Sequence, residues 1–105
     1  MAESRHFSDA SGYAIELTAE RWLHVLSQHQ ELETLESLLA EVLQHPEVIV
    51  RSVHDPQVRL YYKPFPHLWH GKYLVVVVKF ERRCFILTAY ITDKIKGGTK
   101  LWPSG

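Results

Sequence analysis

The hydrophobic pattern changes its period at Pro46, and this change constrains the fold more than any other feature of the chain. Before Pro46, apolar residues recur at the spacing of one helix face, with glutamates outside the stripe. These apolar residues are Leu32, Leu35, Leu38, Leu39, Val42 and Leu43. After Pro46, four segments rich in β-branched and aromatic residues predict strands, at 48–53, 58–63, 72–80 and 84–92. Because the residue before a proline disfavours α geometry, the helical part is predicted to end there.

Two further elements are predicted upstream of the leucine stripe. Residues 13–17 alternate and indicate a short strand. Thr18 is a natural N-cap, and Glu20 complements the positive end of a helix that runs from about residue 19 to residue 29. The two helical stretches form either separate helices or one bent helix.

The order of these elements predicts an α+β domain. An N-terminal strand and two helices are expected to pack on one face of a four- to five-stranded antiparallel sheet, because the connections between the later strands are short. With 105 residues the chain has room for one domain. We expect a flexible lead-in at 1–12, the domain at 13–102 and a tail at 103–105.

The chain has the features of a soluble, cytoplasmic protein. Its one cysteine, Cys84, cannot form an internal disulfide, and its apolar neighbours indicate a packed thiol. The N-terminus lacks the apolar stretch of a signal peptide, and the longest apolar run, at 74–78, is far shorter than the roughly 20 residues that span a bilayer. No membrane partner is therefore expected.

Charge is distributed unevenly along the chain, although the formal net charge is zero. Residues 1–50 carry nine acidic and two basic side chains, a net charge of −7, whereas residues 51–105 carry ten basic and three acidic ones, a net charge of +7. Two interpretations stay open. Either the basic half binds a polyanion, or the acidic helices and basic strands neutralise each other.

Several cationic, aromatic and hydroxyl side chains alternate with apolar residues along the predicted strands. The candidates for one shared polar sheet face are Arg51, Arg59, Tyr61, Lys63, Lys79, Thr88 and Tyr90. Such a face suits a nucleic acid, since bases stack on rings while Arg and Lys hold phosphates. The alternative is ordinary alternation of solvent-facing charges. The central strand is apolar on both sides, so it does not indicate which face is open.

Several short motifs in this order resemble a known family. They are "LTAERWLHVLSQHQEL", "PEVIVRSVHDPQVRLYYKPF" and "GKYLVVVVKFERRCFILTAYITDKIKGG". Together they resemble the barnase, EndoU, colicin nuclease and RelE-like (BECR) group, especially its phage-associated and uncharacterised bacterial branches. The resemblance covers nearly everything from Ile15 to Lys100. It implies helices packed on an antiparallel sheet and a metal-independent ribonuclease activity that is often found in toxins.

The resemblance also implies roles for individual residues. The catalytic set that it suggests is His24, His29, Arg51, Lys72, Thr88 and Tyr90. Within it, a histidine exchanges protons, Arg51 and Lys72 stabilise the phosphate, and Thr88 and Tyr90 position it. Strand alternation, rather than the resemblance, suggests Arg59, Tyr61, Lys63 and Lys79 as the substrate-binding set. No cofactor and no metal are implied.

The spacing of the two histidines limits their joint use. Five residues correspond to about 140° around a helix axis, so His24 and His29 share a face only if the helix breaks between them or just before His29. The alternatives are an exposed surface histidine for His24, and a buried or helix-ending one for His29. Metal binding by His54, Asp55, His67 and His70 is disfavoured, because their spacing matches no established ligand pattern.

Three hypotheses for function follow. The first is a metal-independent endoribonuclease that cleaves RNA by attack of the 2′-hydroxyl, with RNA and an antitoxin-like protein inhibitor as partners. The second is a catalytically silent module of the same fold that binds RNA or protein. The third is a homodimer formed through the apolar loop around Phe65, Leu68 and Trp69 and the tail near Trp102.

Overall fold

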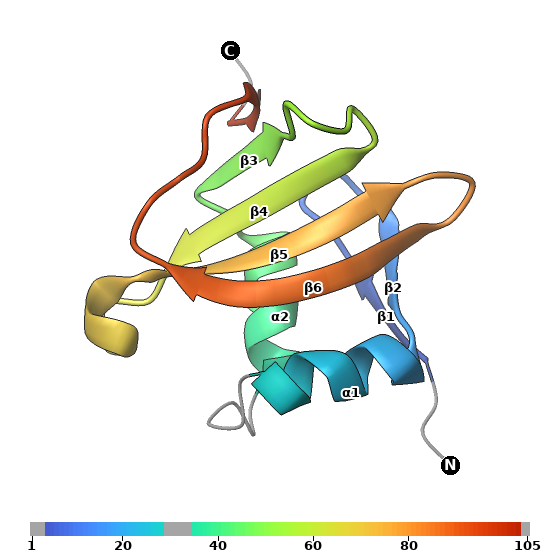
Figure 1. The fold of residues 1–105 in the computed structure, drawn as a ribbon, viewed down its shortest axis with the longest axis horizontal. Helices are drawn as coiled ribbons and strands as arrows, with labels where there is room; N and C mark the ends of the chain where they lie inside the picture. Colours follow the sequence, from blue (N-terminus) through green and yellow to red (C-terminus); the bar gives the residue numbers. More distant parts are fainter. Residues whose placement is uncertain (1–3, 29–34, 104–105) are drawn as a thin grey trace.

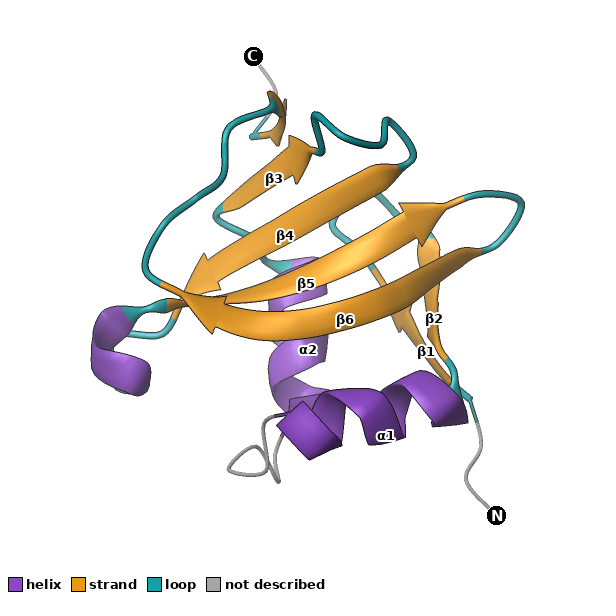
Figure 2. Cartoon of the chain, in the orientation of Figure 1, coloured by secondary structure: helices purple, strands orange, loops and turns teal. Residues whose placement is uncertain are grey.

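The computed structural model describes residues 4–28 and 35–103. Within these ranges the elements follow in the order β1 (Arg5–Ser8), β2 (Ala14–Leu17), α1 (Ala19–Gln28), α2 (Leu35–Gln44), β3 (Val48–Arg51), β4 (Val58–Pro64), a short 3-10 helix (Trp69–Gly71), β5 (Tyr73–Phe80), β6 (Cys84–Thr92) and β7 (Thr99–Trp102). Figure 1 shows α2 behind the long strands and α1 beside β6. Figure 2 separates helices, strands and loops by colour.

The sheet is larger than the sequence predicts, and it is not purely antiparallel. In the described part of the chain it has seven strands in the order β1-β2-β6-β5-β4-β3-β7. Strands β3 to β6 are antiparallel neighbours, but β2 pairs with β6 in parallel, through Ile15 with Cys84 and Glu16 with Phe85. The predicted four- to five-stranded antiparallel sheet, with one N-terminal strand and two helices on one face, is therefore wrong.

The two additional strands are the sheet edges, and both are short. β1 lies in the expected lead-in, where Phe7 is buried although its neighbours His6 and Ser8 are exposed. β7 pairs with β3 across a register shift between Ile49 and Val50. β1 has one apolar residue, Phe7, and in β7 the apolar residues Leu101 and Trp102 are adjacent, so neither segment shows the alternation that predicts a strand. Both are placed by backbone pairing with a neighbouring strand.

The two helices begin and end for local reasons that the sequence indicated. The Thr18 hydroxyl accepts a hydrogen bond from the backbone N–H of Arg21 at 3.2 Å, which confirms Thr18 as the N-cap of α1. α2 ends at Gln44, two residues before Pro46. The described helical stretches are separate elements on either side of residues 29–34.

The main core lies between α2 and the sheet. Leu39, Val42 and Leu43 of α2 are fully buried against strand residues that include Leu74 and Val76. α1 contacts β6 and contributes Trp22 to the margin of this cluster. The side of the sheet that carries α2 is called the helix face below, and the other side is called the open face.

A buried polar pair joins the N-terminal segment to the helix face. Tyr61 is fully buried, and its hydroxyl donates to Asp9 Oδ2 at 2.5 Å. Burial, followed by the hydrogen bond to Asp9, raises the pKa of Tyr61 well above its ordinary range, so the phenol stays protonated and continues to donate. Asp9 Oδ1 accepts from the backbone N–H groups of Ser11 and Tyr13 at 2.9 and 2.8 Å. One carboxylate therefore holds the β1–β2 turn against β4.

Candidate functional site

The open face of the sheet carries a second apolar cluster. Its buried members are Val50, Leu60, Tyr62, Val75 and Val77. No described helix packs on this side; instead, residues 93–98 run from the end of β6 to β7 and approach it at Tyr62. The backbone N–H of Lys96 donates to the Tyr62 hydroxyl at 3.1 Å, which ties this connection to β4.

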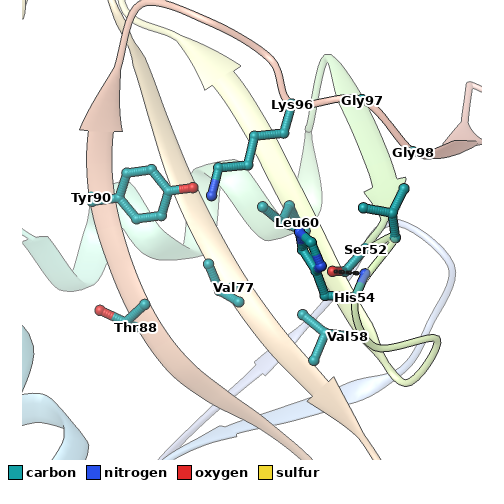
Figure 3. Close-up of a pocket in the computed structure, with 11 residues that line it drawn as sticks. Ser52, His54, Val58, Leu60, Val77, Thr88, Tyr90, Lys96, Gly97 and Gly98 are labelled. Carbon is teal, nitrogen blue, oxygen red and sulfur yellow. Dashed lines mark hydrogen bonds between the residues drawn. The ribbon is translucent and has the colours of Figure 1, made fainter.

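A groove of about 700 Å³ lies on the open face beside this connection. Figure 3 shows Ser52 and His54 on one side, Thr88 and Tyr90 on the other, and Lys96 across one end. The lining comprises Ser52, Val53, His54, Val58, Leu60, Val77, Thr88, Tyr90, Lys96, Gly97 and Gly98. Polar groups from three separate segments thus surround an apolar floor, which is the usual composition of a ligand site.

The β3–β4 loop positions Ser52 and His54 through its own hydrogen bonds. The Ser52 N–H donates to the carbonyl of Val58 at 2.9 Å, and the Ser52 hydroxyl accepts from the His54 N–H at 3.1 Å. Asp55 Oδ1 accepts from the Gln57 N–H at 2.9 Å, an Asx turn of the kind that Asp-Pro sequences favour. His54 therefore lies in a tightly bonded turn although its side chain is exposed.

Lys96 brings a positive charge to the opposite side of the groove. Its ammonium lies 5.9 Å from the centroid of the Tyr90 ring, within the range of a cation–π contact. Burial raises the pKa of Tyr90, so its hydroxyl remains a hydrogen-bond donor at neutral pH. A cation and a phenol side by side can bind an anionic oxygen.

Gly98 permits the close approach of this connection to β3. Its φ is +154°, and a Cβ added there would lie 2.3 Å from the carbonyl oxygen of Arg51 and 2.7 Å from a methyl of Val50. We expect Gly98→Ala to lower the free energy of unfolding by about 1 to 3 kcal/mol, because the backbone must move away from β3. Urea denaturation would measure this loss.

Gly97→Ala is the matched control, since a Cβ added at Gly97 meets nothing within 4 Å. Its unfolding free energy is expected to stay within about 0.5 kcal/mol of the wild type. Equal effects of the two substitutions would contradict the steric explanation.

The structure divides the predicted polar surface between the two faces. Thr88 and Tyr90 line the groove, and Lys79 lies on the same face, opposite Val58. Arg59 stacks on Phe80 of the helix face at 4.1 Å, and the register places Arg51 on that side too, opposite Arg59. The shared surface expected from alternation therefore does not form.

The remaining helix-face residues have structural partners. Tyr61 is buried against Asp9, as described above. The Lys63 ammonium donates to the carbonyl of His45 at 3.1 Å and lies 3.7 Å from Glu41. These contacts agree with mutual neutralisation of the acidic helices and basic strands at this position, and they leave Tyr61 and Lys63 away from the groove.

Two other predicted site residues do not line the groove, and a third is not described. His24 is exposed on α1, and Lys72 is exposed immediately before β5. His29 lies outside the described residues. Of the described members of the predicted catalytic set, Thr88 and Tyr90 are the two brought together there.

Sequence reasoning missed Ser52, His54 and Lys96 as site residues. Ser52 stands in the V-x-R-S motif, and Lys96 precedes the only Gly-Gly pair of the chain. Both therefore lie in sequence features that could have pointed to a site. The sequence indicates His54 only as a possible metal ligand, and one that its spacing disfavours. Among the described residues, no group of three or more His, Cys, Asp or Glu side chains could hold a metal ion.

Comparison with known proteins found no relative of this chain. No protein-family model matches the chain, and no curated protein and no solved structure shows significant similarity to it. None of the helices in the described ranges has the length and apolar character needed to cross a membrane.

Proposed function

We propose that the groove on the open face binds single-stranded RNA and cleaves it without a metal ion. The observation that carries this proposal is the placement of Ser52 and His54 opposite Thr88 and Tyr90, with Lys96 at one end. An imidazole, an ammonium and three hydroxyls then surround one apolar floor. The same activity is the one that the resemblance to the BECR group implies.

The groove offers complementary contacts to each part of a nucleotide. An unstacked base can lie on the apolar floor formed by Val58, Leu60 and Val77, or against the ring of Tyr90. The phosphate next to it can accept hydrogen bonds from the Lys96 ammonium and the Tyr90 hydroxyl. The net charge of +7 over residues 51–105 favours approach of a polyanion.

The proposed reaction needs one proton acceptor and one cation. His54 accepts the proton of the ribose 2′-hydroxyl, because imidazole is the side chain that exchanges protons most readily near neutral pH. The 2′-oxygen then bonds to phosphorus, and the bond from phosphorus to the 5′-oxygen breaks. Lys96 stabilises the negative charge that develops on the phosphate oxygens. The departing 5′-oxygen takes a proton from water, which leaves a 2′,3′-cyclic phosphate and a 5′-hydroxyl.

A second candidate function is RNA binding without cleavage. The observation that favours it is that the described residues of the groove lining include one imidazole, whereas separate acid and base roles are most simply filled by two. Both candidates share the same RNA contacts, so they differ only in the chemical step.

The test is incubation of the protein with a labelled single-stranded RNA, and with DNA of the same sequence, in excess EDTA. We expect RNA fragments that end in 2′,3′-cyclic phosphate, while the DNA is bound but stays intact because it lacks the 2′-hydroxyl. Lys96→Gln should weaken RNA binding and reduce the slope of log K against log salt by about 1.

Lys72→Gln serves as the matched control, because Lys72 is an exposed lysine that does not line the groove. It should leave both affinity and salt dependence unchanged. Binding without fragments would select the second candidate function. Absence of both binding and cleavage would overturn the proposal for RNA.

A further inference from the structure

Lys79 lies beside the groove but is already paired with a carboxylate. It follows Val78 in β5 and stands opposite Val58, one of the residues of the groove floor. Its ammonium donates to Asp55 Oδ2 in a short ion pair. The Lys79 side chain is 19% exposed, so this pair is partly shielded from solvent.

Asp55 connects this ion pair to the turn that carries His54. Its second carboxylate oxygen accepts from the Gln57 N–H at 2.9 Å, and its carbonyl accepts from the Val58 N–H at 3.0 Å. The Lys79 ammonium, followed by the Gln57 N–H, lowers the pKa of Asp55, so the carboxylate stays charged at neutral pH. His54 directly precedes this anchored residue.

A continuous series of hydrogen bonds links Lys79 of β5 to the backbone of His54. Lys79 anchors Asp55, Asp55 is bonded to Val58, and Val58 accepts from Ser52, whose hydroxyl accepts from the His54 N–H. The Asp55 carboxylate compensates the positive charge of Lys79. Lys79 is therefore less available to a phosphate than Lys96, whose ammonium lies 5.9 Å from the centroid of the Tyr90 ring.

We propose that Lys79 is a positioning residue for His54: through Asp55 it holds the β3–β4 turn so that the imidazole faces the groove, and it does not itself contact the RNA. This inference rests on the proposed function for the catalytic consequence. It also replaces the expectation, drawn from strand alternation, that Lys79 belongs to the substrate-binding set.

The test is a double-mutant cycle of Lys79→Met and Asp55→Asn, with three measurements on each variant. These are the rate of RNA cleavage at saturating RNA, the RNA affinity with its salt dependence, and the NMR signals of the His54 ring without RNA. We expect each single variant to lower the rate about 10- to 100-fold, because small displacements of a catalytic group have effects of this size. The double variant should be no slower than the slower single variant.

The accompanying results should separate positioning from phosphate binding. Lys79→Arg keeps the pair and should cleave within about twofold of the wild type. RNA affinity and its salt slope should be unchanged in Lys79→Met. Lys63→Met is the control, because Lys63 is a comparably shielded, ion-paired lysine on the helix face and should leave the His54 signals in place.

Two outcomes would overturn the inference. One is a salt slope that falls by about 1 in Lys79→Met together with additive effects in the cycle, which would mean that Lys79 binds phosphate directly. The other is an unchanged set of His54 ring signals in both single variants. Because the NMR measurement uses no RNA, it tests the positioning role even if the wild-type protein neither binds nor cleaves RNA, a result that would contradict the proposed function alone.

Discussion

Replacing His54 by alanine is expected to lower the rate of RNA cleavage by about 10²- to 10⁴-fold, the range typical for loss of a general base. The side chain is exposed and its backbone N–H bonds to the Ser52 hydroxyl, so truncation at Cβ leaves the turn intact. RNA affinity should stay within about threefold of the wild type. The measurement is the initial rate on a labelled single-stranded RNA in EDTA, at saturating protein.

His67→Ala is the matched control for this prediction. His67 is also an exposed histidine in a connection between strands, but it does not line the groove. Its variant should cleave at the wild-type rate. A His54→Ala protein that cleaves at the wild-type rate would remove His54 from the mechanism, and the same loss in both variants would indicate a general effect of imidazole charge.

Replacing Asp9 by alanine is expected to lower the free energy of unfolding by about 3 to 5 kcal/mol. The Asp9 residue is only 6% exposed, and its carboxylate accepts three hydrogen bonds, from Tyr61, Ser11 and Tyr13. Its removal leaves the fully buried Tyr61 hydroxyl without its acceptor, and unsatisfied buried donors cost about 1 to 3 kcal/mol each. Urea denaturation followed by circular dichroism would measure the loss.

Two further variants define the origin of that loss. Asp9→Asn keeps an acceptor oxygen for the turn, so it should lose about 1 to 2 kcal/mol. Asp93→Ala removes an exposed carboxylate near the end of β6 and should stay within about 0.5 kcal/mol of the wild type. A loss below about 1 kcal/mol in Asp9→Ala would mean that the hydrogen bonds of Asp9 contribute little to stability.

The parts of the fold that could be predicted from the sequence are those with a regular spacing or run of apolar residues. The leucine stripe predicts α2, Thr18 predicts the start of α1, and alternation predicts β3 to β6 within a few residues of their observed ends. β1 and β7 could not be predicted in this way. Each has four residues, as β2 and β3 do, but β1 has one apolar residue, Phe7, and in β7 the apolar residues Leu101 and Trp102 are adjacent, so neither shows the pattern that predicts the other strands.

The candidate site could be predicted only in part, for a related reason. Thr88 and Tyr90 alternate out of a long strand, and they do line the groove. Arg59 and Tyr61 alternate just as regularly, but their side of β4 faces α2 rather than the groove. His54 and Lys96 lie in connections, where no period indicates the direction of a side chain.

The amino-acid sequence alone indicated the two helices, strands β2 to β6 and the side chains that share a face within each strand, because these depend on local geometry. It also determined the separation of acidic and basic halves. The three-dimensional fold was needed to show which face α2 covers, that β2 joins β6 in parallel, and that the β3–β4 turn and the segment before β7 meet across one groove. These features depend on burial and on backbone pairing between residues far apart in the chain. A local sequence pattern predicts neither of them.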